Sequence, residues 1–303
     1  MTSELLLLAL ADGISYAGLL FLVSLGLTLI FGVMGIVNVA HGALYAFGGY
    51  TAATFAMWAA RFYPATPTLV LLGCIVLAAL LVGAVLGAVL EIGLLRRVQD
   101  RDPVMSLLIT FAAFMVLEDV QRLIWGTQPY SAGEVVTRLG NIDLFGITYT
   151  RYQLLLMPGV ALAAYFGLLF FLRRTALGKQ IVAVTHHREM ASALGINARR
   201  IGLLTFIVGA VLGALGGALA APTTSLVPGV GTDMIVLSFS VVATAGLGQI
   251  TGALIASLMI GIARSIAVYT YPELEVAVPY LIMVAVLLVR PNGLFTVAQA
   301  RRI

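Results

Sequence analysis

The side chains that could ligate a metal or transfer a proton are few in this sequence and lie far apart. His186 and His187 are adjacent, yet they lack the cysteine or carboxylate company of a metal site. Cys74 is the only cysteine and lies in an apolar run, so it indicates neither a disulfide nor a metal site. The motifs HExxH and GxSxG do not occur. We therefore predict no catalytic residue, no metal site and no cofactor.

A nucleotide-binding loop is also missing from the sequence. Gly178 and Lys179 are followed by Gln180, and position 173 is an arginine, so the pattern GxxxxGK[ST] is not present. The chain cannot cradle a nucleotide in that way. We expect a non-catalytic protein, and any ATP hydrolysis that drives it must take place on another subunit.

His41 is the histidine with the more informative surroundings. It lies in the segment GVMGIVNVAHG, residues 32–42, where glycine and polar residues crowd together after a long apolar run. Such a density predicts a break in a membrane helix, which survives only where protein or a water-filled cavity satisfies the backbone. Two interpretations of His41 stay open, namely a hydrogen bond at the end of a helix and direct contact with a substrate.

Charged residues inside the apolar runs are sparse, although such residues usually mark ion coupling. Arg264 is the clearest case. Glu118 and Asp119 lie four and three residues before Arg122, so a local ion pair on one helix explains them. We expect local structural roles for all of these residues, and the sequence offers little support for a proton- or sodium-driven carrier.

The composition determines the class of protein that must position these residues. Hydrophobic residues make up 61% of the chain and charged residues only 10%, far below the charged fraction of about a quarter in soluble domains. The sequence therefore predicts a polytopic, all-α integral membrane protein with about eight or nine transmembrane helices, one or two of them broken or re-entrant. We expect one transmembrane domain over residues 1–303, and the N-terminus lacks the basic region of a cleaved signal peptide.

Apolar runs and helix-start signals divide the chain into spans. Thr66-Pro67 and Asp102-Pro103 each combine a helix cap with a proline in the first turn. The predicted crossings lie within residues 5–37, 43–60, 67–95, 104–124, 152–172, 201–221, 234–245, 253–269 and 276–289. Pro158 predicts an irregularity early in its span, and the segment AGLGQITG predicts a break after the short run that starts at Met234.

The distribution of basic residues predicts the orientation in the membrane. One side carries Arg96, Arg97, Arg101, Arg173, Arg174, Lys179, Arg188, Arg199, Arg200, Arg290, Arg301 and Arg302, and the other only Arg61, Arg122, Arg138 and Arg151. By the positive-inside rule, residues 178–200 and the C-terminus are cytosolic and the N-terminus is outside. This topology also explains the net charge of +4 without nucleic acid as a partner.

Residues 178–200 form the longest polar interruption on the basic side. Met190, Ala191 and Leu194 are spaced to share one face of a short helix, Gly195 can end that helix, and Asn197 can cap the next one. The segment is interpreted as a docking surface. The alternative is a basic loop that contacts no partner.

A pore with neither ion coupling nor an ATPase of its own indicates a channel-forming subunit driven by a separate motor. Residues 26–50, GLTLIFGVMGIVNVAHGALYAFGGY, and 178–206, GKQIVAVTHHREMASALGINARRIGLLTF, closely resemble the permease of bacterial branched-chain amino acid ABC importers of the LivH type. Residues 246–263, GLGQITGALIASLMIGIA, resemble the glycine-rich loop and following helix of that family. The resemblance covers essentially the whole chain.

The resemblance implies a set of partners in the bacterial cytoplasmic (inner) membrane. They are a second permease subunit, identical or paralogous, two cytosolic ATP-binding subunits, a soluble substrate-binding protein at the outer face, and membrane lipid. It further implies a coupling helix over Met190–Ile196. The ATPase-coupling residues are then Arg188, Met190, Ala191, Leu194, Gly195 and Ile196.

In the same picture, Asn38, His41 and Gly42 are assigned to the translocation pathway. One departure concerns Thr185-His186-His187, which stand where family members often carry an acidic pair. The resemblance favours leucine, isoleucine and valine as substrates. Related importers for urea, short amides or aromatic carboxylates are the alternative, and an ion-coupled carrier or a channel is the alternative from another class.

Overall fold

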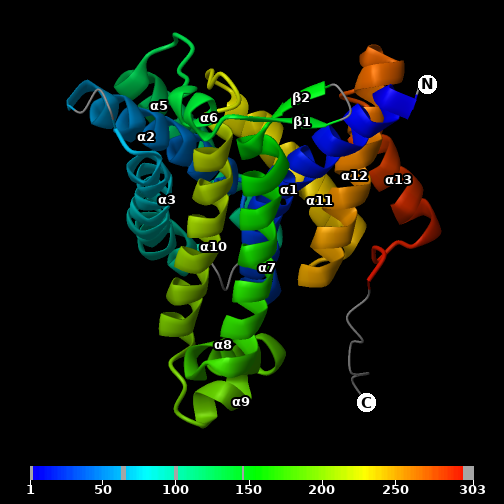
Figure 1. Ribbon diagram of the computed structural model, residues 1–303. Helices are drawn as coiled ribbons and strands as arrows, with labels where there is room; N and C mark the ends of the chain where they lie inside the picture. Colours follow the sequence, from blue (N-terminus) through cyan, green and yellow to red (C-terminus); the bar gives the residue numbers. More distant parts are fainter. Residues whose placement is uncertain (1–2, 63–65, 99–101, 145–146, 296–303) are drawn as a thin grey trace.

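The computed structural model describes residues 3–62, 66–98, 102–144 and 147–295, and helices dominate it (Figure 1). The first half contains α1 (Ser3–Met34), α2 (His41–Phe62), α3 (Thr68–Leu90), the π turn η1 (Glu91–Leu95), α4 (Arg96–Val98), α5 (Pro103–Trp125) and α6 (Glu134–Leu139). Strands β1 (Asn141–Leu144) and β2 (Ile147–Thr150) follow. The second half contains the π turn η2 (Tyr152–Leu156), α7 (Met157–Arg174), α8 (Ala176–His186), α9 (Arg188–Ala193), α10 (Ala198–Ala220), α11 (Val230–Ala245), α12 (Ile250–Thr270), the 3-10 turn η3 (Pro272–Leu274) and α13 (Val278–Val289).

The long helices have the length and composition of membrane spans. Six segments qualify among the described residues: Glu4–Met34, Thr68–Val98, Val104–Trp125, Tyr152–Arg174, Ala198–Ala220 and Ile250–Thr270. Helices α11 and α13 are apolar but shorter. The predicted polytopic, all-α membrane fold is confirmed.

Two helices form the centre of the bundle. Helix α1 packs against α10, α11, α12 and α7, while α10 also packs against α2 and α3. Bulky side chains such as Phe21 of α1, Tyr50 of α2 and Phe206 of α10 are fully buried there. The outer helices α5, α7 and α13 instead expose large apolar side chains, among them Phe111 and Phe166. Hydrophobic burial therefore holds the inner helices together, and the outer faces suit contact with hydrocarbon.

The chain breaks where the glycine-rich segments predict it. Helix α1 passes through Asp12 and Gly13 without interruption and ends at Met34. Residues 35–40 are not helical, and α2 begins at His41. A second break follows α11, where the backbone N–H groups of Leu294 and Phe295 donate to the carbonyls of Thr244 and Ala245 at 2.9 and 3.0 Å. Those two bonds satisfy carbonyls that the end of a helix otherwise leaves unpaired.

The two helix-start predictions have different outcomes. Asp102 caps α5 as expected, because its Oδ1 accepts from the Val104 N–H at 2.8 Å. At α3 the prediction is off by one residue, since Pro67 is the cap and the helix begins at Thr68. The Thr66 hydroxyl instead donates to the carbonyl of Ala59 in α2 at 3.2 Å. A contact across the loop has replaced the local cap.

Residues 125–150 contain more structure than the predicted loop. Helix α6 is followed by an antiparallel hairpin in which Asn141 pairs with Thr150 and Leu144 with Ile147. We call this end of the bundle the hairpin end, and the opposite end, which carries α8 and α9, the α8–α9 end (Figure 1). The π turn η2 lies directly before α7, and Pro158 occupies the first turn of α7.

Candidate functional site

The polar interruption at residues 178–200 folds into two short helices, α8 and α9, where the sequence predicted one. They lie at the end of the bundle where α7 arrives and α10 departs (Figure 1). The Thr175 hydroxyl starts α8 by accepting from the Gly178 N–H at 3.0 Å. His187 has an extended φ of −146° and separates the two helices. Helix α8 thus holds α9 at the tip of the molecule.

The end of α9 is fixed by backbone hydrogen bonds. The Ile196 N–H donates to the Ala191 carbonyl and the Gly195 N–H to the Ser192 carbonyl, both at 3.0 Å, which is the pattern of a Schellman motif. Gly195 has a φ of +86°, a conformation that glycine adopts without strain. Asn197 then caps α10 by accepting from the Arg200 N–H at 3.0 Å. The predicted helix end at Gly195 and the cap at Asn197 are confirmed.

The side chains of α9 point in two directions. Ala191 is only 3% exposed and packs in a small hydrophobic core with Ile181, Val184 and Ile201. Met190 and Leu194 are 64% and 82% exposed. The prediction that Ala191 shares their face is therefore wrong, because residues four apart lie on one side of a helix while neighbours are about 100° apart.

The remaining coupling candidates lie beside these residues. Arg188 is exposed at the start of α9, and Ile196 packs on the small core just described. Helix α9 ends at Ala193, so the segment predicted as a helix over Met190–Ile196 is half helix and half terminating turn. The result is a rigid support that presents two large apolar side chains outward.

His41 lies deep in the bundle at the start of α2. Its ring is fully buried, packs against Gly26 of α1 and Gly213 of α10, and its Nε2 donates to the Val23 carbonyl at 3.0 Å. Val23 and Gly213 belong to the interior of their helices, so α2 begins beside the middle of α1 and α10. The ring acts as a wedge that fixes this starting point.

The other two pathway candidates surround the same point. Gly42 packs against the backbone of Gly231, so the first turns of α2 and α11 touch. Asn38 is fully buried, and its amide has no hydrogen-bond partner among the described residues. Such a group costs about 1–3 kcal/mol. The structure thus brings Asn38, His41 and Gly42 together among α1, α2, α10 and α11.

The charged residues for which the sequence predicted local structural roles, Arg264 and the group Glu118, Asp119 and Arg122, have partners in the structure, as expected. Arg264 pairs with Glu275, and its guanidinium lies 4.1 Å from the ring centroid of Tyr16. Arg122 contacts Glu118 at 2.6 Å and Asp119 at 3.3 Å.

Two acidic residues were missed by the sequence reasoning. Glu91 is 1% exposed and pairs with Arg96 at 3.1 Å across the π turn η1. Their five-residue spacing matches the i to i+5 geometry of a π turn and could have signalled the pair. Asp12 accepts a hydrogen bond from the Tyr269 hydroxyl. In β2, outside the spans, burial and then the negative charge of Asp12 raise the pKa of Tyr149.

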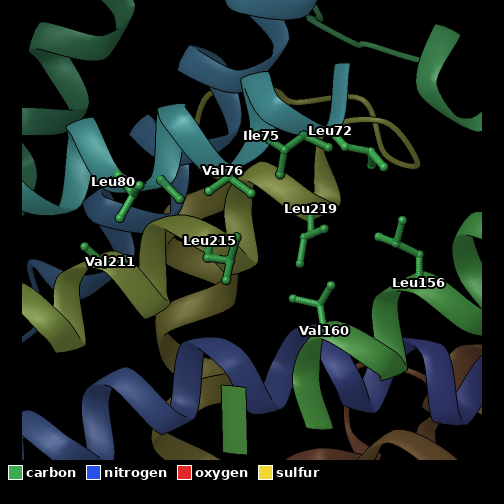
Figure 2. Close-up of a pocket in the computed structure, with 10 residues that line it drawn as sticks. Leu72, Ile75, Val76, Leu80, Leu156, Val160, Val211, Leu215 and Leu219 are labelled. Carbon is green, nitrogen blue, oxygen red and sulfur yellow. The ribbon is translucent and has the colours of Figure 1, made fainter. Parts of the chain in front are cut away.

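Two of the hollows formed by the described residues differ clearly in chemistry. A groove of about 320 Å³ lies between α3, α10 and the start of α7, and Figure 2 shows that only leucine, isoleucine, valine and alanine side chains line it. A cavity of about 270 Å³ at the hairpin end is lined by charged, hydroxyl and apolar groups. Recognition of a polar small molecule requires a few converging polar groups. Of the two hollows, only the cavity at the hairpin end offers them.

Comparison with known proteins finds a matching family model and several relatives. Residues 9–287 match a family model described as the permease component of branched-chain amino acid transport systems. The high-affinity branched-chain amino acid transport system permease protein LivH of Escherichia coli (strain K12) is 27% identical over 293 residues, which cover 93% of each chain.

Two further relatives have similar sequence identities. The permease protein BraD of Pseudomonas aeruginosa is 26% identical, with 94% of each chain covered. A probable LivH protein of Methanocaldococcus jannaschii is 27% identical over 94% of this chain and 91% of its own. A chain in the structure of PsaBC from Streptococcus pneumoniae with a Fab superposes with a TM-score of 0.49 at 12% identity, covering 92% of this chain and 89% of that one.

Proposed function

The chain belongs to the family of permease components of branched-chain amino acid transport systems, and from this premise we propose that it is the transmembrane permease subunit of an ATP-driven importer for leucine, isoleucine and valine. It acts as a single permease domain and does no chemistry of its own. ATP-binding subunits and a substrate-binding protein complete the transporter, together with a second permease subunit, identical or paralogous.

One observation carries the coupling role. Met190 and Leu194 are large, apolar and exposed at the tip of the α8–α9 end, while Ala191 and Ile196 attach α9 to the small core beneath. Apolar anchors on a helix that fit a hydrophobic groove are a common mode of protein recognition. In our proposal α9 sits in a groove of an ATP-binding subunit. Arg188 flanks this contact, and Gly195 ends the helix so that α10 can leave it.

The small core is what allows α9 to transmit movement. Ile201 belongs to α10, and Phe171 and Leu172 of α7 pack on the same core. A displacement of α9 therefore reaches both long helices as a rigid-body shift. The α8–α9 end is cytosolic in this proposal, because the basic residues of α7, α8, α9 and α10 gather there. The hairpin end then faces the binding protein.

Asn38, His41 and Gly42 belong to the translocation pathway in this proposal. The buried, unpaired amide of Asn38 supports it, because a hydrogen-bonding group left unpaired in one state gains a partner when the bundle opens to water or substrate. His41 and Gly42 hold the start of α2 in register beside that amide. Substrate would pass where α1, α2, α10 and α11 meet.

Leu194→Arg tests the coupling surface. A buried charge at the anchor should cost about 2–4 kcal/mol of binding free energy, or about a 30- to 1,000-fold loss in affinity for the ATP-binding subunit. Co-purification of the ATP-binding subunit and ATP-dependent leucine uptake in proteoliposomes would report it. Ser192→Arg is the matched control, since it places the same charge on the other side of α9. Normal co-purification and uptake with Leu194→Arg would refute the proposal.

The substrate class needs a separate measurement. Uptake of leucine, isoleucine and valine should depend on ATP and on the partner binding protein, and an ionophore should leave it unchanged. A partner binding protein selective for urea, a short amide or an aromatic carboxylate would overturn the amino acid assignment. Uptake that follows an ion gradient without ATP would make the chain a secondary carrier.

A further inference from the structure

The cavity at the hairpin end is built from helices that are far apart in the chain. Asp12, Ser15, Tyr16 and Leu19 of α1 line one wall, and Arg264, Val268 and Tyr269 of α12 line another. Gln153 and Met157 close it from η2 and α7, and Thr223, Thr224 and Glu275 from the loops. This wall of α1 follows the spacing i, i+3, i+4 and i+7, so one continuous face of the helix borders the cavity.

Both signs of charge are present at this cavity. The Arg264 guanidinium is held by Glu275 on one side and by the Tyr16 ring beneath it. A guanidinium has five N–H donors, and in the described part of the chain only Nη2 of Arg264 has a hydrogen bond, to Glu275. Donors are therefore left for an anionic group. Asp12 is held by the Tyr269 hydroxyl and keeps acceptor capacity for a cationic group.

The rest of the lining is apolar, and the volume is small. Leu19, Met157 and Val268 come from three different helices and contribute hydrocarbon. The volume of about 270 Å³ lies just below the range of about 300–1,000 Å³ for sites of drug-sized ligands. A single small molecule with an aliphatic side chain matches this space.

We propose that this cavity is a binding site for the zwitterion of an aliphatic amino acid, with its carboxylate on Arg264, its ammonium on Asp12 and its side chain against Leu19, Met157 and Val268. The proposal rests on the proposed function for the substrate class, and it adds a site within this chain at the outer end. Leucine delivered by the binding protein would stop here before it moves deeper.

The same face of α1 leads from this cavity toward the pathway candidates. Leu19 borders the cavity, and Val23 lies one turn further along that face. The carbonyl of Val23 accepts the hydrogen bond from His41 at the start of α2. The cavity and the start of α2 therefore lie beside successive turns of α1.

A photoreactive diazirine analogue of leucine tests the site in the complete transporter, reconstituted in nanodiscs without the binding protein. Irradiation should label residues of the cavity, identified by mass spectrometry. Excess leucine should suppress the label, whereas leucinol, which lacks the carboxylate, and 4-methylpentanoate, which lacks the ammonium, should compete at least about tenfold less well. Equal competition by leucinol would overturn zwitterion recognition in favour of an ammonium site.

Variants separate binding from a structural role of the ion pair. Asp12→Asn and Arg264→Gln should each lower labelling about tenfold or more. Glu275→Gln breaks the same ion pair but leaves the guanidinium in place, so labelling should stay at the wild-type level or rise. A loss in Glu275→Gln equal to that in Arg264→Gln would mean that the pair serves only the fold, and the site proposal would fall.

Glu118→Gln is the matched control for removing a paired carboxylate at the hairpin end, since Glu118 pairs with Arg122 away from the cavity. Its labelling should equal that of the wild type. ATP-dependent leucine uptake by the wild-type transporter with its binding protein is measured in parallel. Normal uptake without label in the cavity would refute this site alone, and absent uptake would refute the proposed function.

Discussion

The α8–α9 end and the hairpin end differ in the chemistry of their side chains and in whether these side chains face outward or line a cavity. At the α8–α9 end, Met190 in the six-residue helix α9 and Leu194 at its C-terminal cap are apolar and exposed. At the hairpin end, Asp12 and Arg264 are charged and turned into a cavity. An outward apolar pair suits a protein surface, and inward charges suit a small polar molecule. This difference is the basis for our proposal that one end couples to a partner subunit and the other recognises substrate.

The inner helices connect these two ends by close backbone contact. Gly217 of α10 lies so near the Tyr45 carbonyl of α2 that a Cβ atom there would overlap it. Gly217→Ala should therefore cost about 1–3 kcal/mol or more, because backbone must move to make room. This is the largest effect we expect, because the substitution should disrupt both ends of the molecule together. It should give a low yield of assembled transporter and a lower unfolding temperature.

Gly73 of α3 provides the control for that experiment. A Cβ atom at this position meets no atom within 4 Å, so Gly73→Ala should be neutral or gain up to about 1 kcal/mol from the better helix propensity. Equal damage from the two substitutions would show that close packing of α10 on α2 is not what joins the ends.

The second prediction compares one variant at each end by the same two measurements, co-purification of the ATP-binding subunit and labelling of the cavity. Leu194→Arg should abolish co-purification of the ATP-binding subunit while the cavity still takes the photoreactive leucine analogue. Asp12→Asn should show the reverse, with normal assembly and labelling lowered about tenfold or more. A variant at one end that removes both readouts would contradict the division of roles.

The third prediction concerns the middle of the bundle. Asn38→Leu replaces an unpaired buried amide with hydrocarbon of similar shape, so the free energy of unfolding should stay the same or rise while uptake falls. His41→Ala removes a wedged ring and its bond to Val23, which should lower the free energy of unfolding by about 2 kcal/mol or more.

His41→Ala should also lower uptake more than it lowers the yield of the complex, because a displaced α2 carries Asn38 with it. Uptake and thermal unfolding of both variants would be measured on the assembled transporter. Equal losses of uptake and yield in His41→Ala would leave that ring with a structural role only, and unchanged uptake in Asn38→Leu would remove Asn38 from the pathway.

The smallest effect belongs to Arg122→Gln. The Arg122 side chain is 46% exposed and pairs with Glu118 and Asp119 at the hairpin end, outside the cavity. Such pairs contribute less than about 1 kcal/mol. Labelling, assembly and uptake should all match the wild type, and a clear loss of labelling would extend the recognition region to α5.

The sequence predicted the helix ends correctly where they depend only on residues nearby in the chain. Asp102, Asn197 and Gly195 act at helix ends through atoms two to five residues away, so their roles can be read along the chain. The same holds for the break at residues 35–40. Thr66 shows the limit, because a contact with Ala59 in the preceding helix replaced the cap that its position before proline predicts.

Two features could not be predicted because they depend on contacts between distant parts of the chain. They are the buried orientation of Ala191 and the cavity at the hairpin end. Nothing within α9 tells that α8 and Ile201 will cover Ala191 and leave Leu194 open. Asp12 and Tyr269 meet across 257 residues, and each alone looks like an isolated polar residue in an apolar helix. Sequence spacing contains no information on such pairs, because only the packing of α1 on α12 creates them.

The contact between the last described residues and α11 has a consequence for biogenesis. The carbonyls of Thr244 and Ala245 accept from Leu294 and Phe295, which the ribosome adds after α12 and α13. During synthesis, the end of α11 therefore enters the membrane before its own hydrogen-bond donors exist. The final turn of α11 is therefore completed only after α12, α13 and the segment that follows them have been synthesised, so this turn forms later than the helices that come after it in the chain.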